Sequence, residues 1–266
     1  MSIPEDYIPD IPGQFQARAN TAPWSKNLAT PRVALAIGAH PDDIEFGCGG
    51  TLAKWAAAGC LVHHLILTDG SKGSWDPTED RATLVAARQI EQRDSAAALG
   101  ATGRVEFLGW PDGELQSGIQ QQWQVAFWIR KLVPNVVLGH DPWCRYRLHP
   151  DHRHAGFLTT DGIVAARDPH FFAEQNMPHH RPDALLLWEA DEPDHGEDVT
   201  GFVAAKLAGI QAHHSQFRST MGVDRTSPDA NAQLDAFRER ISVRLSEHGA
   251  TIGAPHAEAF KVITAL

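Results

Sequence analysis

The strongest constraint on the fold of this chain is the alternation of short apolar runs with helical patterns. The apolar runs are RVALAIG (32–38), LVHHLILT (61–68), RVEFLGW (104–110), NVVLGH (135–140) and DALLLWEA (183–190). The first, second and fourth runs are nearly continuous in Val, Leu, Ile and Ala, as is typical of strands that helices cover on both faces. The segments 48–59, 78–100 and 118–133 repeat apolar residues every three or four positions, as amphipathic helices do. The alternation predicts an α/β fold, a single Rossmann-like domain with a mostly parallel sheet flanked by helices.

Three further helices are expected along the chain. One begins near Asp151, and the others cover about 200–213 and 228–248. A length of 266 residues fits one large α/β domain. We therefore expect residues 1–30, which are polar and contain several prolines, to form an N-terminal tail, and residues 31–266 to form one domain.

The composition argues against some classes of partner. Asp and Glu number 33 against 23 Lys and Arg, a formal charge of −10, so we expect no binding to nucleic acid or to an anionic membrane surface. No apolar stretch is long enough to span a bilayer, and residues 1–30 lack the apolar segment of a signal peptide. The three cysteines form no CxxC pair, which fits a reducing compartment. These features favour a cytoplasmic protein, and they leave open whether it forms a homo-oligomer.

Two loops rich in histidine and aspartate follow the first and fourth predicted strands. They read AHPDD (39–43) and HDPWCRYRLHPDH (140–152). Ligands of doubly wound sheets bind at the carboxyl ends of the strands, so two loops at that edge can meet in space. Helix capping explains either loop alone, but it does not explain both at one edge. Together the loops supply the candidate site residues His40, Asp42, Asp43, His149, Asp151 and His152.

These residue types suit a catalytic metal ion. Three nitrogen and oxygen ligands with one open position are typical of catalytic zinc. A carboxylate that lies near the metal without binding it can act as a general base toward water. The same ligand types also bind Fe(II), Mn(II) and Co(II). The residues therefore predict one divalent metal, for which zinc is the preferred candidate.

The motifs AHPDD and HPDH (149–152) resemble those of the PIG-L (LmbE-like) family of zinc-dependent N-acetylglucosaminyl deacetylases. Softer matches extend over most of the chain: LTDGSKGSW (67–75), RQIE (88–91), PDGEL (111–115) and KLAGIQAHHSQF (206–217). The resemblance implies a zinc-dependent hydrolase. Its activity would be to remove an acyl group, usually acetyl, from an amino sugar such as N-acetylglucosamine carried on a larger molecule.

The resemblance also implies roles for the residues of the two main motifs. It makes His40, Asp43 and His152 the metal ligands and Asp42 the general base. His149 would stabilise the oxyanion or protonate the leaving amine.

The softer motifs imply contacts with the substrate. Arg88 and Asp112 match positions that bind sugar hydroxyls, and Asp151 is expected to orient His149. Two positions depart from the family pattern. Ile44 follows the first motif where glutamate is common, and Ser71 stands where relatives often carry a glutamate that contacts the sugar. The chemistry is therefore better specified than the substrate.

Alternative interpretations remain at the level of sequence. Another metallo-amidase could act on a different amide, such as a thiol conjugate or an antibiotic precursor. A catalytically silent domain could bind a saccharide, although Asp42 and His149 are both present. Arg88 and Glu91 could simply form a pair on a helix surface. The expected substrate is a small, neutral or modestly polar amino sugar conjugate.

Overall fold

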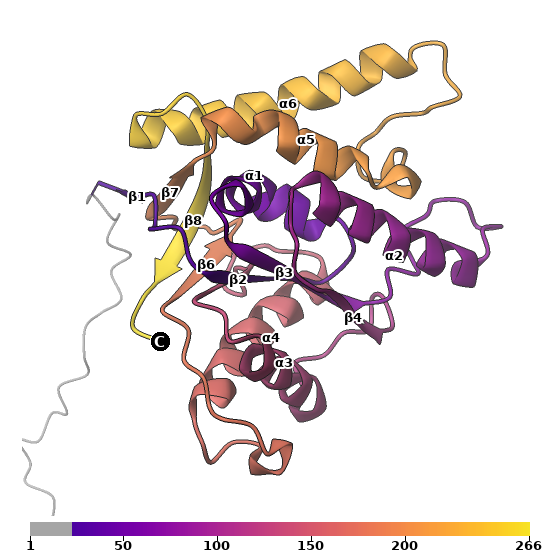
Figure 1. The fold of residues 1–266 in the computed structure, drawn as a ribbon. Coiled ribbons are helices and arrows are strands. Elements are labelled where there is room, and N and C mark those ends of the chain that lie inside the picture. Colours follow the sequence, from indigo (N-terminus) through magenta and orange to yellow (C-terminus); the bar gives the residue numbers. More distant parts are fainter. Residues whose placement is uncertain (1–22) are drawn as a thin grey trace, which may run out of the picture.

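An eight-stranded sheet with helices on both faces forms the centre of the computed structural model, which describes residues 23–266 (Figure 1). The strand order is β1-β7-β8-β6-β5-β2-β3-β4. The strands are β1 (Ser25–Lys26), β2 (Val33–Gly38), β3 (Leu61–Thr68), β4 (Val105–Trp110), β5 (Val136–His140), β6 (Ala184–Trp188), β7 (His195–Asp198) and β8 (Ala257–Ile263). The predicted α/β class is confirmed.

All five predicted strands are present. They are β2 to β6, and the pairings β6-β5-β2-β3-β4 are all parallel. Every residue of β2 and β5 is buried. Their continuous apolar sequence therefore reflects cover by helices on both faces of the sheet.

Three strands were not predicted, and they lie together at one edge of the sheet. β8 runs antiparallel to both β6 and β7, which makes the sheet mixed. β1 pairs in parallel with β7, so Ser25 and Lys26 of the expected N-terminal tail belong to the sheet. Residues 1–22 of that tail lie outside the described residues.

The helices form two layers. α3 (Ile119–Leu132) and α4 (Pro150–Arg167) cover one face, where Val125 and Leu158 join the core. α1 (Asp43–Ala57), α2 (Arg81–Ala98) and α5 (Val203–Gln211) cover the other face, and α6 (Ala230–Ile252) packs on β7 and β8 (Figure 1). Short 3-10 turns occupy Ala173–Gln175, Thr200–Phe202 and His214–Gln216.

Helix α1 begins earlier than predicted and is broken inside. It was expected over 48–59 but begins at Asp43, with non-helical φ and ψ of −146° and 18° at Cys48. The Lys206 ammonium donates to the carbonyls of Glu45 and Phe46 before the break, each at 2.8 Å. The Glu258 carboxylate accepts from the amides of Gly50 and Thr51 after it, at 2.9 and 2.7 Å.

Lys206 and Glu258 also bind each other, with 2.6 Å between Nζ and Oε1, and both side chains are only 3% exposed. A broken helix leaves carbonyls and amides without partners, and an ion pair of this kind satisfies both sets. The break therefore has a specific buried cause rather than being a flexible point. The break, at Cys48, lies five residues after the AHPDD loop.

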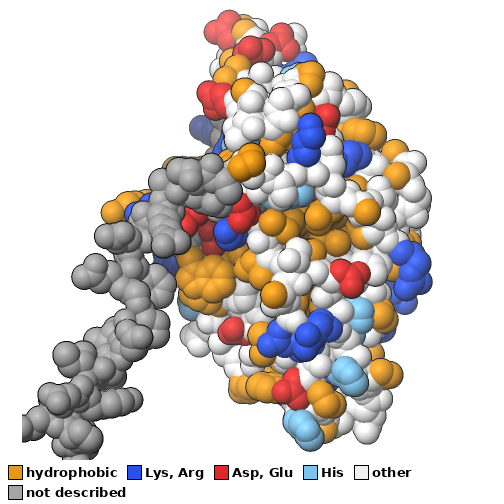
Figure 2. All heavy atoms as spheres, turned by 90° about the vertical axis from the view of Figure 1, so that its left-hand side faces the viewer, with side chains coloured by type: hydrophobic (Ala, Val, Ile, Leu, Met, Phe, Trp, Pro, Cys, Tyr) orange, Lys and Arg blue, Asp and Glu red, His pale blue; other side chains and the backbone are white. Residues whose placement is uncertain are grey.

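On the face shown in Figure 2, Lys and Arg side chains are scattered among acidic, apolar and polar ones and form no continuous basic patch. Among the helices that the structure describes, none has the length and apolar character needed to cross a membrane.

Candidate metal centre and active site

The two predicted loops meet at the carboxyl edge of the sheet, between β2 and β5. β2 ends at Gly38 and leads into loop 39–43, whereas β5 ends at His140 and leads toward α4. The chain passes from β2 to β3 on one side, and β5 lies on the other side of β2. The loops therefore flank a switch point of the sheet, where doubly wound proteins bind their ligands.

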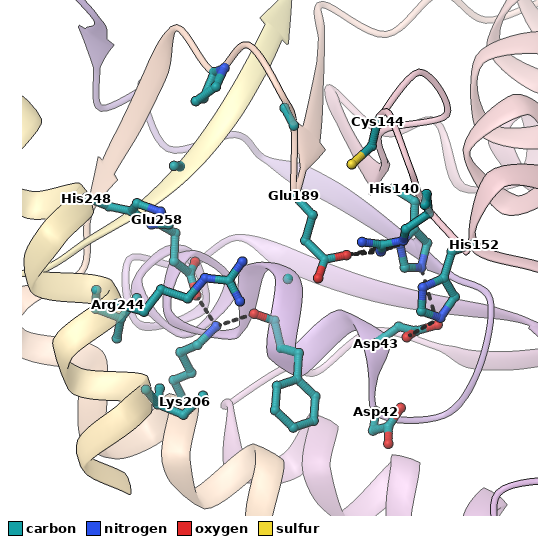
Figure 3. Close-up of a pocket in the computed structure, with 18 of the residues that line it drawn as sticks. Asp42, Asp43, His140, Cys144, His152, Glu189, Lys206, Arg244, His248 and Glu258 are labelled. Carbon is teal, nitrogen blue, oxygen red and sulfur yellow. Dashed lines mark hydrogen bonds and ion pairs between the residues drawn. The ribbon is translucent and has the colours of Figure 1, made fainter. Parts of the chain in front are cut away.

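Three side chains converge as metal ligands would. Nδ1 of His40 lies 3.3 Å from Oδ2 of Asp43, Nε2 of His152 lies 3.2 Å from Oδ1 of Asp43, and the two histidine nitrogens are 3.3 Å apart. The two histidines contact different oxygens of Asp43, and one candidate ligand atom from each of the three residues lies within 4.8 Å of the other two. The three predicted ligands are thus close enough to bind one divalent ion, and Figure 3 shows Asp43 and His152 of this set.

The histidines keep the Asp43 carboxyl ionised. Burial alone would raise the pKa of Asp43, but the nearby imidazoles of His152 and His140 hold it well below its usual range. An ionised carboxylate between imidazole nitrogens is the state that binds a divalent cation.

The outer nitrogen of His40 faces two carboxylates. Nε2 lies 3.1 Å from Oδ2 of Asp151 and 3.2 Å from Oδ1 of Asp112. Burial alone would lower the pKa of His40, but contacts with Asp112 and Asp151 raise it well above its usual value. Carboxylates on the second nitrogen of a ligating histidine fix the ring and raise its basicity.

This arrangement gives Asp151 a different partner from the one expected, because Asp151 was expected to orient His149. The Asp151 carboxylate instead contacts His40 and accepts from the amides of Gly113 at 2.6 Å and Leu115 at 3.2 Å. Asp112, expected to bind a sugar hydroxyl, also contacts His40. Both carboxylates therefore support the first candidate ligand.

Asp42 is set apart from the ligands. Its backbone has φ 103°, in the left-handed region, and its amide donates to Oε1 of Gln92 at 3.0 Å. The carboxylate lies 3.6 Å from the guanidinium of Arg88 and forms no capping hydrogen bond with α1. Capping of α1 by its side chain, the structural alternative for Asp42, therefore does not explain why this position carries an aspartate.

The environment of Asp42 adjusts its acidity. Burial raises the pKa of Asp42 to about 6, and the positive charge of Arg88 acts in the opposite direction. Arg88 is buried as well, and it donates to the carbonyl of Gly70 at 2.8 Å and to that of Pro41. It is not a helix-surface residue. A carboxylate with a pKa near neutrality suits proton transfer.

His149 stands at the N-cap position of α4, on the open side of the centre. Its ring centroid lies 4.7 Å from that of His40 and 4.7 Å from that of His152. Burial, followed by the charge of His40, lowers the pKa of His149. The neutral ring can donate a proton to an oxygen from one nitrogen.

The sequence interpretation missed His140, the last residue of β5. Trp188 Nε1 and Arg147 donate to its Nδ1, at 3.0 and 3.2 Å. Because both partners are obligate donors, a neutral ring carries its proton on Nε2, which lies 3.3 Å from Oδ2 of Asp43. His140 therefore orients Asp43. His140 could have been predicted as a site residue because it ends a strand at the same edge of the sheet as the candidate site.

Two other groups of possible metal ligands share residues with the first. One consists of His40, Asp112 and His149, and the other of His140, His152 and Glu189. In the latter, Glu189 pairs with Arg147, and the Nδ1 of His140 is taken by Trp188. A guanidinium and an indole N–H thus already hold the atoms that a cation in this latter group would need.

Two of the predicted substrate contacts, Ser71 and Asp112, line a separate open groove. Lys72, which was not predicted, also lines it, and its amide donates to Oδ2 of Asp112 at 2.9 Å. On the other side of the centre, Asp42, Asp43 and His152 open into a cavity of about 490 Å³ that reaches α6 (Figure 3). The candidate centre thus lies between a groove and a deeper cavity.

Comparisons with known proteins agree with this site. The PIG-L family model, described as GlcNAc-PI de-N-acetylase, matches residues 35–163. Diacetylchitobiose deacetylase of Thermococcus kodakarensis is 35% identical over 186 residues, covering 69% of each chain. A 1D-myo-inositol 2-acetamido-2-deoxy-alpha-D-glucopyranoside deacetylase of Rhodococcus jostii is 31% identical over 242 residues, covering 81% of this chain and 82% of that one. The chain belongs to the PIG-L (LmbE-like) family.

Solved structures agree on the fold. N,N'-diacetylchitobiose deacetylase of Pyrococcus horikoshii, solved with an inhibitor, has a TM-score of 0.78 and 28% identity, covering 88% of this chain and 84% of that one. The 4-carboxy-2-hydroxymuconate hydratase GalB of Pseudomonas putida has a TM-score of 0.70 at 20% identity and shares the fold alone. The fold thus supports more than one chemistry, and function has to be argued from the site.

Proposed function

We propose that this protein is a zinc-dependent hydrolase that removes the N-acetyl group of an N-acetylglucosamine-type conjugate. The observation that supports it most is the separation of Asp42 from the ligand set. One ligand atom from each of His40, Asp43 and His152 lies within 4.8 Å of the others, whereas the Asp42 carboxylate faces Arg88 and has a raised pKa. A domain that only binds saccharide has no need for such a carboxylate. The named activities of the relatives also support deacetylation.

The candidate residues divide the chemistry between them. Zinc held by His40, Asp43 and His152 would polarise the amide carbonyl and make nearby water more acidic, toward a pKa of about 7. Asp42 accepts the proton of the attacking water at its carboxylate. His149 donates its N–H to the carbonyl oxygen as negative charge develops there. The C–N bond then breaks as the proton held by Asp42 passes to the leaving nitrogen, and acetate and a free amino sugar result.

The supporting residues hold this arrangement in place. Asp112 and Asp151 fix the ring of His40, and His140 fixes the carboxylate of Asp43. Arg88 pairs with Asp42 and keeps it from becoming too basic. Contact of Arg88, Asp112 and Ser71 with sugar hydroxyls remains part of the proposal, and the groove lined by Ser71 and Asp112 supports it. A cytoplasmic location is also part of the proposal, and the three unpaired cysteines favour it.

Acetate release tests the proposal. Purified protein loaded with zinc is incubated with N-acetylglucosamine conjugates that differ in the attached group, and both acetate and free amine are measured. We expect equal amounts of the two products, and release slower by about 10²–10⁴-fold from Asp42→Asn protein at the same zinc content. Release of amine from other amides, with none from any N-acetylglucosamine conjugate, would favour a different metallo-amidase.

A further inference from the structure

The cavity beyond the metal centre is larger than an acetyl group requires. It opens beside Asp43 and His152 and extends to α6, where Arg244 and His248 form its far end. Figure 3 shows the Arg244 side chain reaching from α6 into this space, on the side opposite His152. Its volume of about 490 Å³ leaves room for a further part of a substrate.

The charges in the cavity leave one arginine unpaired. Lys206 is neutralised by Glu258, and Arg147 by Glu189. Within residues 23–266, no carboxylate lies within ion-pair distance of the Arg244 guanidinium, and no hydrogen bond holds it. After burial, the positive charge of Arg244 is the largest influence that lowers the pKa of His248. Arg244 is thus an exposed residue at the edge of the cavity, and its charge acts on a residue that lines the cavity.

The wall between Arg244 and the metal centre is partly apolar. Phe46 from α1 and Ile241 and Leu245 from α6 line it. Phe46 is held by an edge contact with Phe237, whose ring centroid is 6.1 Å away. A ligand that lies against these apolar side chains and reaches Arg244 needs an apolar or ring-shaped middle part and an anionic end.

We propose that this cavity holds the aglycone of the conjugate and that Arg244 pairs with an anionic group on it, a carboxylate or a phosphate. The guanidinium presents a planar fork of donors that matches either anion. This inference rests on the proposed deacetylase function and refines the neutral or modestly polar substrate expected from sequence. Arg244 would then select the substrate without taking part in bond cleavage.

Matched substrates test this selection. The α and β anomers of 4-carboxyphenyl and 4-phosphonooxyphenyl N-acetylglucosaminide are compared with the neutral 4-carbamoylphenyl compounds. We expect kcat/KM to be about 10-fold higher for an anionic compound, the value of one charge-assisted hydrogen bond. The carboxylate and phosphate arms show which anion is preferred. Arg244→Gln should remove the preference by lowering kcat/KM for the anionic compounds to the value for the neutral ones.

Two controls make the result specific. Arg238→Gln changes an arginine of the same helix that pairs with Asp235 outside the cavity, and it should keep the preference. N-succinylglucosamine with a neutral aglycone places the anion on the acyl side. If only that compound gains from Arg244, the cavity holds the acyl group and the proposal is overturned. Equal kcat/KM for anionic and neutral aglycones also overturns it.

A binding measurement separates this inference from the proposed function. Calorimetry follows binding of the product, 4-carboxyphenyl glucosaminide, to wild-type and Arg244→Gln protein without any turnover. We expect about 10-fold weaker binding by the variant. Binding that depends on Arg244 but without deacetylation of any substrate would contradict the proposed function alone. Deacetylation in which Arg244 has no effect on binding or preference would contradict the inference alone.

Discussion

Asp42 and Asp43 are neighbours in sequence, but their carboxylates face different partners. That of Asp42 lies 3.6 Å from the Arg88 guanidinium, whereas that of Asp43 lies within 3.3 Å of nitrogens of three histidines, His40, His140 and His152. The cause is local. The left-handed backbone of Asp42, with φ 103°, directs its side chain away from the direction taken by the first helical residue, Asp43. Two adjacent carboxylates can therefore have two functions.

The ligand set predicts how metal is lost. Wild-type protein should hold about one zinc per chain, and Asp43→Asn or His152→Ala should bind it much more weakly, because each removes one of three protein ligands. Elemental analysis after dialysis measures this. His154→Ala changes a nearby histidine of α4 that contacts Ser117 and should keep full zinc content. Full zinc content in both ligand variants would place the metal elsewhere.

Asp112 distinguishes support of the metal from contact with sugar. Because its Oδ1 lies 3.2 Å from Nε2 of His40, Asp112→Asn should weaken zinc affinity by about 10–100-fold. Competition with a chelator gives the affinity directly. If Asp112 only binds a sugar hydroxyl, zinc affinity will be unchanged and only the KM for sugar substrates will rise.

Arg88 should set the acidic limit of activity. Burial raises the pKa of Asp42 to about 6, and Arg88 counteracts that rise. A general base works only when deprotonated, so kcat/KM should fall as pH drops through the pKa of Asp42, which a bound cation lowers further. Arg88→Gln removes a positive charge, raises that pKa and should move the acidic limb to higher pH. A limb that stays in place or moves to lower pH would show that Asp42 is not the titrating base.

The buried pair at the break in α1 should dominate local stability. Lys206→Met leaves the Glu258 charge unpaired and should lower the free energy of unfolding by about 3–5 kcal/mol. The double variant Lys206→Met/Glu258→Gln should lose less, because no unpaired charge remains. Lys72→Met, which breaks an exposed contact with Glu114 and a hydrogen bond to the Asp112 carbonyl, should cost about 1 kcal/mol. Denaturant titration measures all three, and equal losses in the Lys206 and Lys72 variants would contradict this account.

The sequence predicted the features that have local signals. Continuous Val, Leu and Ile runs identified β2 to β6, and motif spacing brought His40, Asp43 and His152 to one edge of the sheet. β7 and β8 were missed because HGED is short and polar, and because the pairing of AEAFKVI depends on β6 and β7. Neither strand is specified by its own residues alone.

The partners of the site carboxylates could not be predicted for a related reason. Asp112 follows β4, and Asp151 begins α4, so their contact with His40 depends on how three elements pack. His140 was interpreted only as the last residue of a predicted strand, so it was not included among the candidate site residues. The break in α1 depends on Lys206 and Glu258, which lie far along the chain. Such contacts are properties of the assembled fold.

Turnover by Asp42→Asn protein at a zinc content equal to that of the wild type tests the central claim most directly. Asparagine keeps the size of the side chain but cannot accept the proton of water. Acetate release should therefore fall by about 10²–10⁴-fold with zinc content and melting temperature unchanged. Acetate release at the wild-type rate would contradict the assignment of Asp42 as the base, and loss of zinc from this variant would contradict its separation from the ligands.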